Sequence, residues 1–277
     1  YPDDQRQILI AYDKAKNDWQ RAFDADSEAR RAGALPKPEV PTVRTKAVTE
    51  AEPRDYGTVD APDRSALGKH FAEQFASGKA YPTIGEARRE AGEKLGGEIK
   101  PGTAAAKMVD EAVEIGVVRT ASDIVRKGKD PRETFDKLLD LYNRQPNLNV
   151  RTSTSIEQQA YSTPAPLAFL AQKMAGVDKN STIYEPTAGN GMLVIGTRSE
   201  NAVVNELNPD RAAALKAMGY SVTTQDAAEY TPPKKVDAVI ANPPFGAARD
   251  ENGRKSWTID GVATNELDHA ITLRDAV

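Results

Sequence analysis

The chain has 277 residues, of which 39% are apolar and 28% charged, and a formal net charge of −4; this length and composition predict about two domains with at least one hydrophobic core. No run approaches the ~18 apolar residues of a transmembrane helix, and no charged and then apolar leader opens the chain, so we expect a cytoplasmic rather than a membrane or secreted protein. The absence of cysteine excludes disulfides, thiolate metal sites and cysteine nucleophiles, and two histidines are too few for a histidine-rich metal site.

Neither half of the chain is a basic arm. Residues 1–150 carry 25 basic and 26 acidic side chains, and residues 151–277 carry 12 and 15. If the protein binds nucleic acid, it does so through a local basic surface.

The first 63 residues predict a helix and a linker. Residues 3–31 carry apolar side chains at steps of three and four, which indicates an amphipathic helix, taken as the unit 1–31. Residues 32–63 contain five prolines and hardly any periodic apolar residue, which indicates an extended linker that trypsin cuts early.

Residues 64–150 predict a helical accessory domain. The expected helices are 64–77, 83–95, 103–115, 120–127 and 131–143. Thr83 and Glu86 have the spacing of a capping box, and Pro131 suits a first helical turn. A basic cluster with acidic residues interspersed is interpreted as a solvated face rather than a phosphate site; it comprises Arg119, Arg126, Lys127, Lys129 and Arg132.

From residue 151 to 277 the pattern changes to an α/β domain. Four short β-type runs alternate with helical stretches at 191–198 and 209–219, and a last helix is expected at about 264–277. The expected strands are Ser181–Glu185, Ala202–Leu207, Ser221–Asp226 and Val236–Asn242. Such alternation predicts βαβ units and a parallel sheet.

A glycine-rich turn follows the first predicted strand, in the sequence Glu185-Pro186-Thr187-Ala188-Gly189-Asn190-Gly191. Glycines there let the backbone turn sharply and approach a ligand closely. The spacing is neither that of a dinucleotide loop nor that of a phosphate-binding loop. A nucleotide-crevice turn is favoured over a plain strand–helix turn.

Acidic residues close the next two strands. Glu206 lies 21 residues beyond Glu185, about where doubly wound folds place the carboxylate that holds a ribose diol, and Asp226 is suited to accept from an adenine amino group. Three carboxylates at three strand ends predict a site for a nucleoside that carries a cation such as a sulfonium rather than phosphate.

The fourth strand ends in Asn242-Pro243-Pro244-Phe245-Gly246. The two prolines stiffen the loop and fix the Asn242 carboxamide oxygen and the Pro243 carbonyl as acceptors. An NH₂ group held between two acceptors keeps its lone pair free for attack, and Phe245 offers a face for a planar group. The alternative is a Pro-Pro turn around a buried aromatic side chain.

Together these motifs resemble the S-adenosylmethionine-dependent amino-methyltransferases of nucleic acid, in particular the adenine-N6 group. The resemblance implies a Rossmann-like class I sheet and methyl transfer from S-adenosylmethionine to the N6 amine of a DNA adenine that is flipped out of the duplex. It assigns catalysis to Asn242, Pro243, Pro244 and Phe245. It assigns cofactor binding to Tyr161, Thr163, Glu185, Pro186, Thr187, Gly189, Gly191, Glu206, Asp226 and Ala227.

The segment Gln159–Pro164 precedes the glycine turn, which is the motif order of the gamma group of these enzymes. More narrowly, the stretch from Gln145 to the Asn-Pro-Pro-Phe loop resembles phage and plasmid proteins that join such a methylase to a strawberry-notch-type helicase. That resemblance implies a helicase region in the same polypeptide, a bacterial or phage-infected host cell, and a link to restriction-modification or antirestriction.

Two alternative functions stay open. A carboxamide presents the same NH₂ group as adenine, so the protein could methylate glutamine N5 in a protein; a non-catalytic DNA-associated or virion-packaged module that keeps the cofactor pocket is the other reading. Cytosine-C5 chemistry is excluded because it needs a thiolate, and cytosine-N4 enzymes usually carry Ser where this chain has Asn242. Because the family's sheet has about seven strands and four are predicted, we expect the chain to be a C-terminally truncated part of a longer protein.

Overall fold

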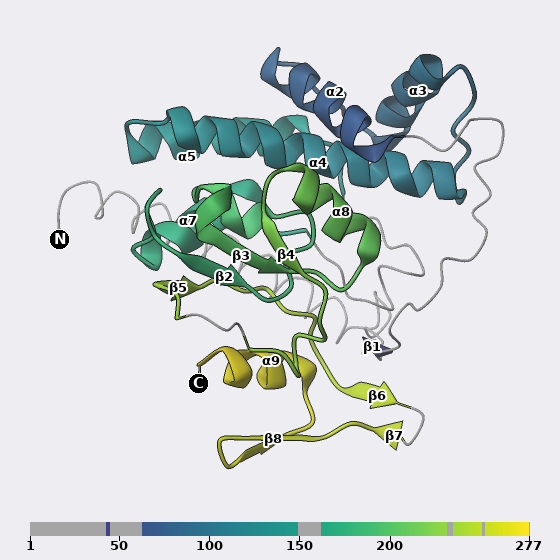
Figure 1. The fold of residues 1–277 in the computed structure, drawn as a ribbon. Coiled ribbons are helices and arrows are strands. Elements are labelled where there is room, and N and C mark those ends of the chain that lie inside the picture. The colour runs from purple at the N-terminus through teal and green to yellow at the C-terminus, as the bar shows by residue number, and fades with distance from the viewer. Residues whose placement is uncertain (1–42, 45–62, 149–161, 232–234, 251–252, 277) are drawn as a thin grey trace, which may run out of the picture.

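The computed structural model describes residues 43–44, 63–148, 162–231, 235–250 and 253–276 (Figure 1). The predicted helix over 3–31, the predicted linker apart from Val43–Arg44 and Asp63, and Tyr161 lie outside these described residues. The unit boundaries at 31/32, 63/64 and 150/151 stay predictions.

Four helices form the part of the chain that precedes the sheet. Three of them match their predictions to within about two residues, and one corrects a prediction. The expected pieces 103–115 and 120–127 form a single helix, because the residues between them contain no proline and the adjacent Val117 and Val118 are buried in the core. The helices are α2 (Arg64–Ala76), α3 (Ile84–Leu95), α4 (Ala104–Lys127) and α5 (Pro131–Arg144).

Side-chain caps explain where these helices begin. The Asp63 carboxylate accepts from the backbone N–H groups of Ser65 and Ala66 at 2.9 and 3.0 Å. The Thr83 hydroxyl accepts from Glu86 N–H at 3.3 Å, which confirms the predicted N-cap of α3. Pro131 occupies the first turn of α5, as its fixed φ favours.

The α/β part contains a four-stranded parallel sheet, as predicted, in the order β4-β3-β2-β5. Each strand is shorter than its prediction. The chain leaves β2 towards β3 and β4 on one side and returns to β5 on the other, so a topological switch point lies between β2 and β5. The strands are β2 (Ile183–Glu185), β3 (Ala202–Asn205), β4 (Ser221–Thr223) and β5 (Ala238–Val239).

The helices beside the sheet differ in part from prediction. Helix α8 (Pro209–Ala217) begins at the Asn208 cap and confirms the predicted 209–219 segment, whereas α7 (Ala165–Met174) was not predicted. The helix predicted over 191–198 is wrong: only a 3₁₀ turn, η1 (Met192–Val194), forms. Residues 192–195 are all buried, so this stretch has no solvent face on which an amphipathic helix could rest.

The segment after β5 forms small antiparallel elements that the sequence analysis had not predicted. Strand β6 (Ala248–Asp250) pairs with β7 (Gly253–Arg254) and, in parallel, with β1 (Val43–Arg44). Strands β8 (Trp257–Ile259) and β9 (Val262–Thr264) form a hairpin with an Asp260-Gly261 turn, in which both residues have positive φ. Helix α9 (Leu267–Ala276) confirms the predicted last helix; η2 (Ser199–Asn201) precedes β3.

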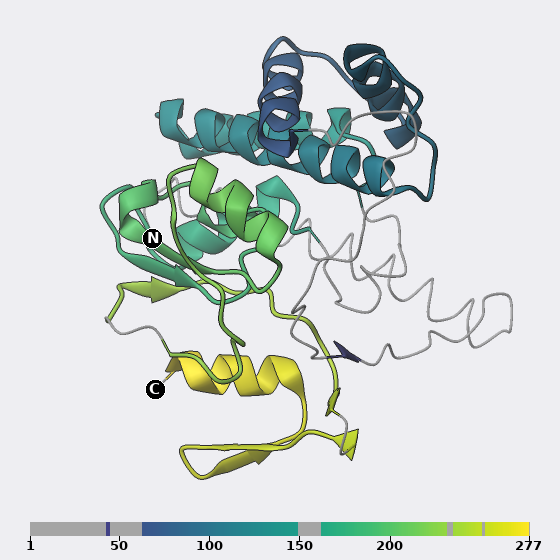
Figure 2. The same cartoon turned by 45° about the vertical axis from the view of Figure 1, so that its right-hand side comes forward.

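The elements are stacked in layers (Figures 1 and 2). Helices α2 to α5 lie outermost, α7 and α8 lie between them and the sheet, and α9 with the β8–β9 hairpin lies on the other side of the sheet. One hydrophobic core joins the helical region to the sheet; it includes Phe71, Val113, Leu138, Phe169, Ile183 and Val204. A smaller cluster holds α9 on the hairpin through Trp257, Ile259, Leu267 and Ile271. Among the described helices, none has the length and apolarity to cross a membrane.

Candidate functional site at the carboxyl edge of the sheet

Parallel pairing brings the predicted motifs to one edge of the sheet. Strand β2 ends at Glu185, β3 ends at Asn205 next to Glu206, and β5 ends three residues before Asn242. Because the strands are parallel, these ends lie on the same side, next to the switch point between β2 and β5. Open α/β sheets bind their ligands at this place.

The glycine turn needs its glycines at two positions. Gly189 and Gly191 have φ of +57° and +89°, a region that other L-residues rarely adopt. A Cβ added at Gly189 would meet nothing within 4 Å, whereas one at Gly191 would meet the Leu215 side chain at 3.0 Å. Gly189 therefore faces open space, where a ligand can approach the backbone, and Gly191 permits close packing against α8.

Asn205 is a residue that the sequence analysis missed. Its side chain is 1% exposed and donates to the backbone carbonyls of Pro186 at 3.0 Å and Gln225 at 2.9 Å. Its carboxamide oxygen accepts from the Thr223 hydroxyl at 2.8 Å and from Gln225 N–H at 2.9 Å. Asn205 thus ties together the ends of β2, β3 and β4. Its signal is a polar residue at the end of an otherwise apolar strand.

Glu206 links the third strand to the glycine turn. Its carboxylate is 7% exposed and accepts from Gly189 N–H at 2.7 Å and from Asn208 N–H at 2.8 Å. Burial raises the pKa of Glu206, while Arg211 and the two N–H groups act to lower it. A carboxylate has about four acceptor positions, so this one can still accept from ligand hydroxyls.

Glu185 lies deeper, at 2% exposure. Its Oε2 has no hydrogen-bond partner in the described part of the chain. Burial, reinforced by the nearby negative charge of Glu206, raises the pKa of Glu185 well above its usual range. A buried acceptor without a donor is costly, and a bound donor or cation would satisfy it. In the same turn, the Thr187 hydroxyl is also buried without a partner among the described residues.

Asp226 and Ala227 follow β4 and turn towards the C-terminal elements. Asp226 accepts from Ala228 N–H at 3.0 Å, and its Oδ2 lies 3.6 Å from the Lys255 ammonium. Lys255 lies closer to Glu229, at 2.9 Å. Ala227 is buried in the smaller cluster with α9. A cation beside Asp226 is not predicted from the sequence.

The Asn242 loop is open to solvent at Asn242 and Phe245. Asn242 is exposed and Phe245 is 55% exposed, so the alternative of a Pro-Pro turn around a buried aromatic side chain does not hold. Asn242 Nδ2 donates to the Thr163 hydroxyl at 3.1 Å, which joins two predicted site segments that are 79 residues apart. Since nitrogen and oxygen of a carboxamide lie on opposite sides, this contact turns the Asn242 oxygen away from Thr163.

Helix α9 anchors the far end of this loop. The Gly246 carbonyl accepts from Leu267 N–H at 2.8 Å, and Gly246 N–H donates to Asp268 at 3.2 Å. The loop is therefore held at both ends while its middle stays accessible.

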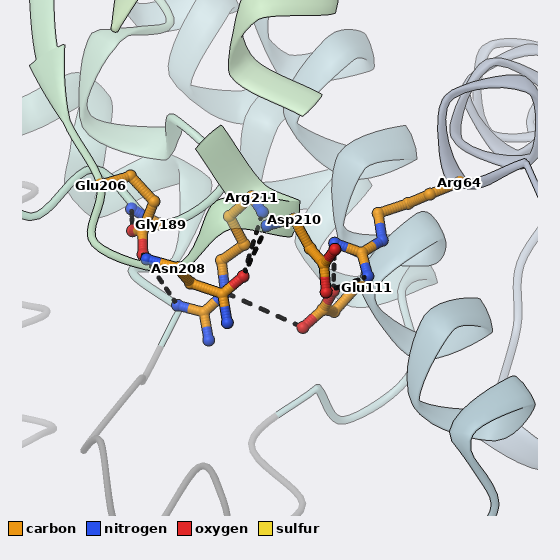
Figure 3. A network of polar contacts seen from close by, with 7 residues as sticks. All are labelled: Arg64, Glu111, Gly189, Glu206, Asn208, Asp210 and Arg211. Atoms are coloured by element: carbon orange, nitrogen blue, oxygen red, sulfur yellow. Dashed lines mark hydrogen bonds and ion pairs between the residues drawn. The ribbon is translucent and has the colours of Figure 1, made fainter. Parts of the chain in front are cut away.

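The helical region contributes charged residues beside the glycine turn that the sequence analysis had not assigned to a site. Figure 3 shows Arg64 and Glu111 from this region next to Asp210 and Arg211 of α8, with Glu206 and Gly189 beyond them. Glu114, one helical turn from Glu111, receives hydrogen bonds from Ser162 and Asn190, and burial raises its pKa. The carboxyl edge is thus acid-rich, with arginines that lie between the acids.

A cavity of about 270 Å³ lies beside Thr163, where the helical region meets the start of α7. Its lining comprises Val117, Tyr142, Asn143, Gln145, Pro146, Leu148, Ser162, Thr163, Pro164 and Met192. The predicted basic cluster lies elsewhere and its described members are partly paired: Arg126 and Lys127 with Asp123, and Arg132 with Asp136. Because Arg119, Arg126 and Lys127 of this cluster line a second cavity of about 610 Å³, the interpretation of a solvated face stays a prediction.

No protein-family model matches the sequence, and no curated protein is found to be similar to it. Among the described residues, no group of three or more His, Asp or Glu side chains is placed to hold a metal ion.

Proposed function

We propose that this protein transfers a methyl group from S-adenosylmethionine to the N6 amine of adenine in DNA. One observation carries the proposal. The accessible Asn242-Pro243-Pro244-Phe245 loop lies at the carboxyl edge of the sheet, and Asn242 contacts Thr163 beside the helical region.

The residues at this edge fit the chemistry of the cofactor. Glu206 would hold the ribose hydroxyls, Asp226 and Ala227 the adenine, and Thr163 with Tyr161 the methionine end. Glu185, whose buried Oε2 lacks a partner among the described residues, adds an acceptor beneath the glycine turn. When bound, S-adenosylmethionine supplies an electrophilic methyl group on a sulfonium, and an acid-rich edge favours such a cation.

The chain itself supplies orientation and electrostatics. The Asn242 oxygen and the Pro243 carbonyl accept from the two N–H bonds of the target amine, so its lone pair points towards the methyl donor. Phe245 stacks on the base, which must leave the duplex at a cost of about a few kcal/mol. The developing positive charge on nitrogen is stabilised by the two acceptors, and its surplus proton passes to water. No covalent enzyme intermediate is involved.

The test is methylation of defined substrates by the protein at its natural length. With S-adenosylmethionine labelled in its methyl group, duplex DNA should gain labelled N6-methyladenine, which digestion and mass spectrometry detect as adenine plus one labelled methyl group. Label on glutamine of a protein would instead support the glutamine-N5 alternative. Cofactor binding without transfer to either would support the non-catalytic module. A helicase region in the same polypeptide and a phage or antirestriction setting belong to the same proposal.

A further inference from the structure

We infer that Arg211 is the positioning residue for Glu206 and that the helical region controls it through Glu111 and Arg64. The inference rests on the proposed function, because it concerns the ionisation of Glu206, the carboxylate proposed to bind the cofactor. The helical region would then affect cofactor binding, because it supplies Arg64 and Glu111.

Arg211 lies between two carboxylates that come from different parts of the fold (Figure 3). Its Nη1 is 4.0 Å from Glu206 Oε1 on the sheet side, and its Nε is 3.8 Å from Glu111 Oε1 on α4. Both distances exceed a normal hydrogen bond, so neither carboxylate captures the guanidinium. Its side chain is 15% exposed, which keeps water from screening either attraction.

Arg64 holds the other side of Glu111. Arg64 Nη1 lies 2.8 Å from Glu111 Oε2, and its Nη2 lies 3.4 Å from Asp210 Oδ2. The side chains of Arg64 and Glu111 are 12% and 14% exposed. Arg64 is the first residue of α2, directly after the Asp63 cap, and Asp210 is the neighbour of Arg211 on α8. The chain of charges therefore runs without a gap from α2 through α4 to α8 and the end of β3.

The groups that face Glu206 come from three elements and act with different signs. Arg211 of α8 lowers its pKa, whereas Glu111 of α4 raises it, and Glu185 of β2 is a further acid that interacts with Glu206. Glu111, Glu114 and Asp210 in turn attract Arg211. Burial is the largest cause of the raised pKa of Glu206, and the position of this one guanidinium between the acids adjusts that pKa. The ionised carboxylate, which carries no O–H donor, is the better acceptor for the two ribose hydroxyls.

The experiment is a calorimetric titration of the natural-length protein with S-adenosylmethionine at a series of pH values. The measured quantity is the midpoint, the pH at which the affinity has fallen to half of its maximum as the pH is lowered and Glu206 takes up a proton. Arg211→Gln should move this midpoint up by roughly one unit, the scale of a lost charge at this distance. Glu111→Gln should move it down, because it removes a like charge and leaves Arg211 to Glu206 alone. Arg211→Lys keeps the charge and should leave the midpoint close to that of the unmodified protein.

Asp110, which precedes Glu111 on α4, provides a matched control. Arg88 of α3 pairs with Asp110 of α4 at 2.5 Å, with side chains 15% and 24% exposed, and among the described residues this ion pair includes no group of the sheet. Asp110→Asn should therefore leave the midpoint unchanged. If Arg211→Gln does not fold, Arg64→Gln serves instead: it frees Glu111 to draw Arg211 from Glu206 and should raise the midpoint.

The inference is supported if Arg211→Gln and Glu111→Gln move the midpoint in opposite directions. Neither shift should occur in a protein that also carries Glu206→Gln. Shifts of the same sign, or an equal shift with Asp110→Asn, would overturn it, since general loosening of the fold acts alike on all variants. If the unmodified protein does not bind S-adenosylmethionine at all, the proposed function fails first. Binding with unmoved midpoints refutes the inference alone.

Discussion

Under the proposed function, the two accessible side chains of the Asn242 loop would have separable tasks. Asn242 donates to Thr163 at 3.1 Å, which would leave its oxygen to polarise the target amine, while the half-exposed Phe245 would offer a surface for stacking. Asn242→Ala should therefore slow single-turnover methylation by a factor of roughly 10²–10³. Enzymes lose about this much rate when one preorganised hydrogen-bond partner of a developing charge is removed. Cofactor affinity should change little.

Phe245→Ala gives the complementary result. It should weaken binding of an adenine-containing duplex by about 1–3 kcal/mol if stacking acts as it does in single-strand binders. The measurement is duplex titration at saturating cofactor, with Asn180→Ala, an exposed asparagine on a distant turn, as control. For the Asn242 prediction, near-normal turnover by Asn242→Ala would show that this loop does not take part in the methyl-transfer step.

A second residue-scale prediction concerns Asp275 on α9. Burial raises the pKa of Asp275 from 3.8 to about 7, and neither of its carboxyl oxygens has a hydrogen-bond partner among the described residues. Between these two values the folded protein holds a proton that the unfolded chain has lost, so stability declines as the pH rises and the full penalty is present above about 7. Asp275→Asn should raise the melting temperature more at pH 8 than at pH 5. An equal rise at both would contradict the assigned pKa.

At the scale of elements, two glycines allow α2 and α4 to cross closely. A Cβ added at Gly116 of α4 would lie 2.6 Å from Phe71 Cβ and 3.0 Å from Ala72 N, and one at Gly68 of α2 would lie 2.5 Å from the Ile115 side chain. The opposing atoms at Gly116 include backbone, which cannot move aside cheaply. These two glycines therefore set how closely α2 and α4 can pack.

Gly116→Ala should therefore destabilise the protein by about 1–3 kcal/mol in spite of the better helix propensity of alanine. Gly85→Ala in α3 is the matched control. There the nearest atom to an added Cβ is the Thr83 hydroxyl at 3.7 Å, so alanine should stabilise by about 0.5–1 kcal/mol. Urea unfolding of both variants measures the difference, and similar values for the two would show that the crossing is not tight.

At the scale of the whole molecule, the helical region and the sheet share one core. Leu138 of α5 is fully buried in the same cluster as Ile183 of β2 and Val204 of β3. Leu138→Ala should lower the free energy of unfolding by about 2–5 kcal/mol. It should also reduce hydrogen-exchange protection in the sheet as well as in the helices.

The smaller cluster provides the contrast. Ile271 of α9 packs with Trp257 and Ile259 rather than with the shared core. Ile271→Ala should reduce protection in α9 and the hairpin first. Loss of protection confined to the helices in Leu138→Ala would mean that the two parts unfold separately.

The sequence by itself determined the elements whose cause is local. The cap at Thr83 and the proline at the start of α5 are set by residues a few positions apart, and both match the fold. The four apolar runs of strand type also form strands, although each strand is shorter than its prediction. The helix predicted over 191–198 does not form, because its central residues 192–195 are all buried and leave no solvent face. The Asp260-Gly261 hairpin turn carried a local signal and was overlooked.

Only the tertiary structure decided which of the motif residues meet and what surrounds them. The Asn205 hub, the contact between Thr163 and Asn242, and the charges that link Arg64 to Glu206 join residues far apart in the chain. Hydrophobic periodicity reports which side of an element is buried, but it does not report which distant element covers that side. Position in space follows from the packing of the whole core, and that packing brought the arginines and acids of the helical region to the carboxyl edge of the sheet.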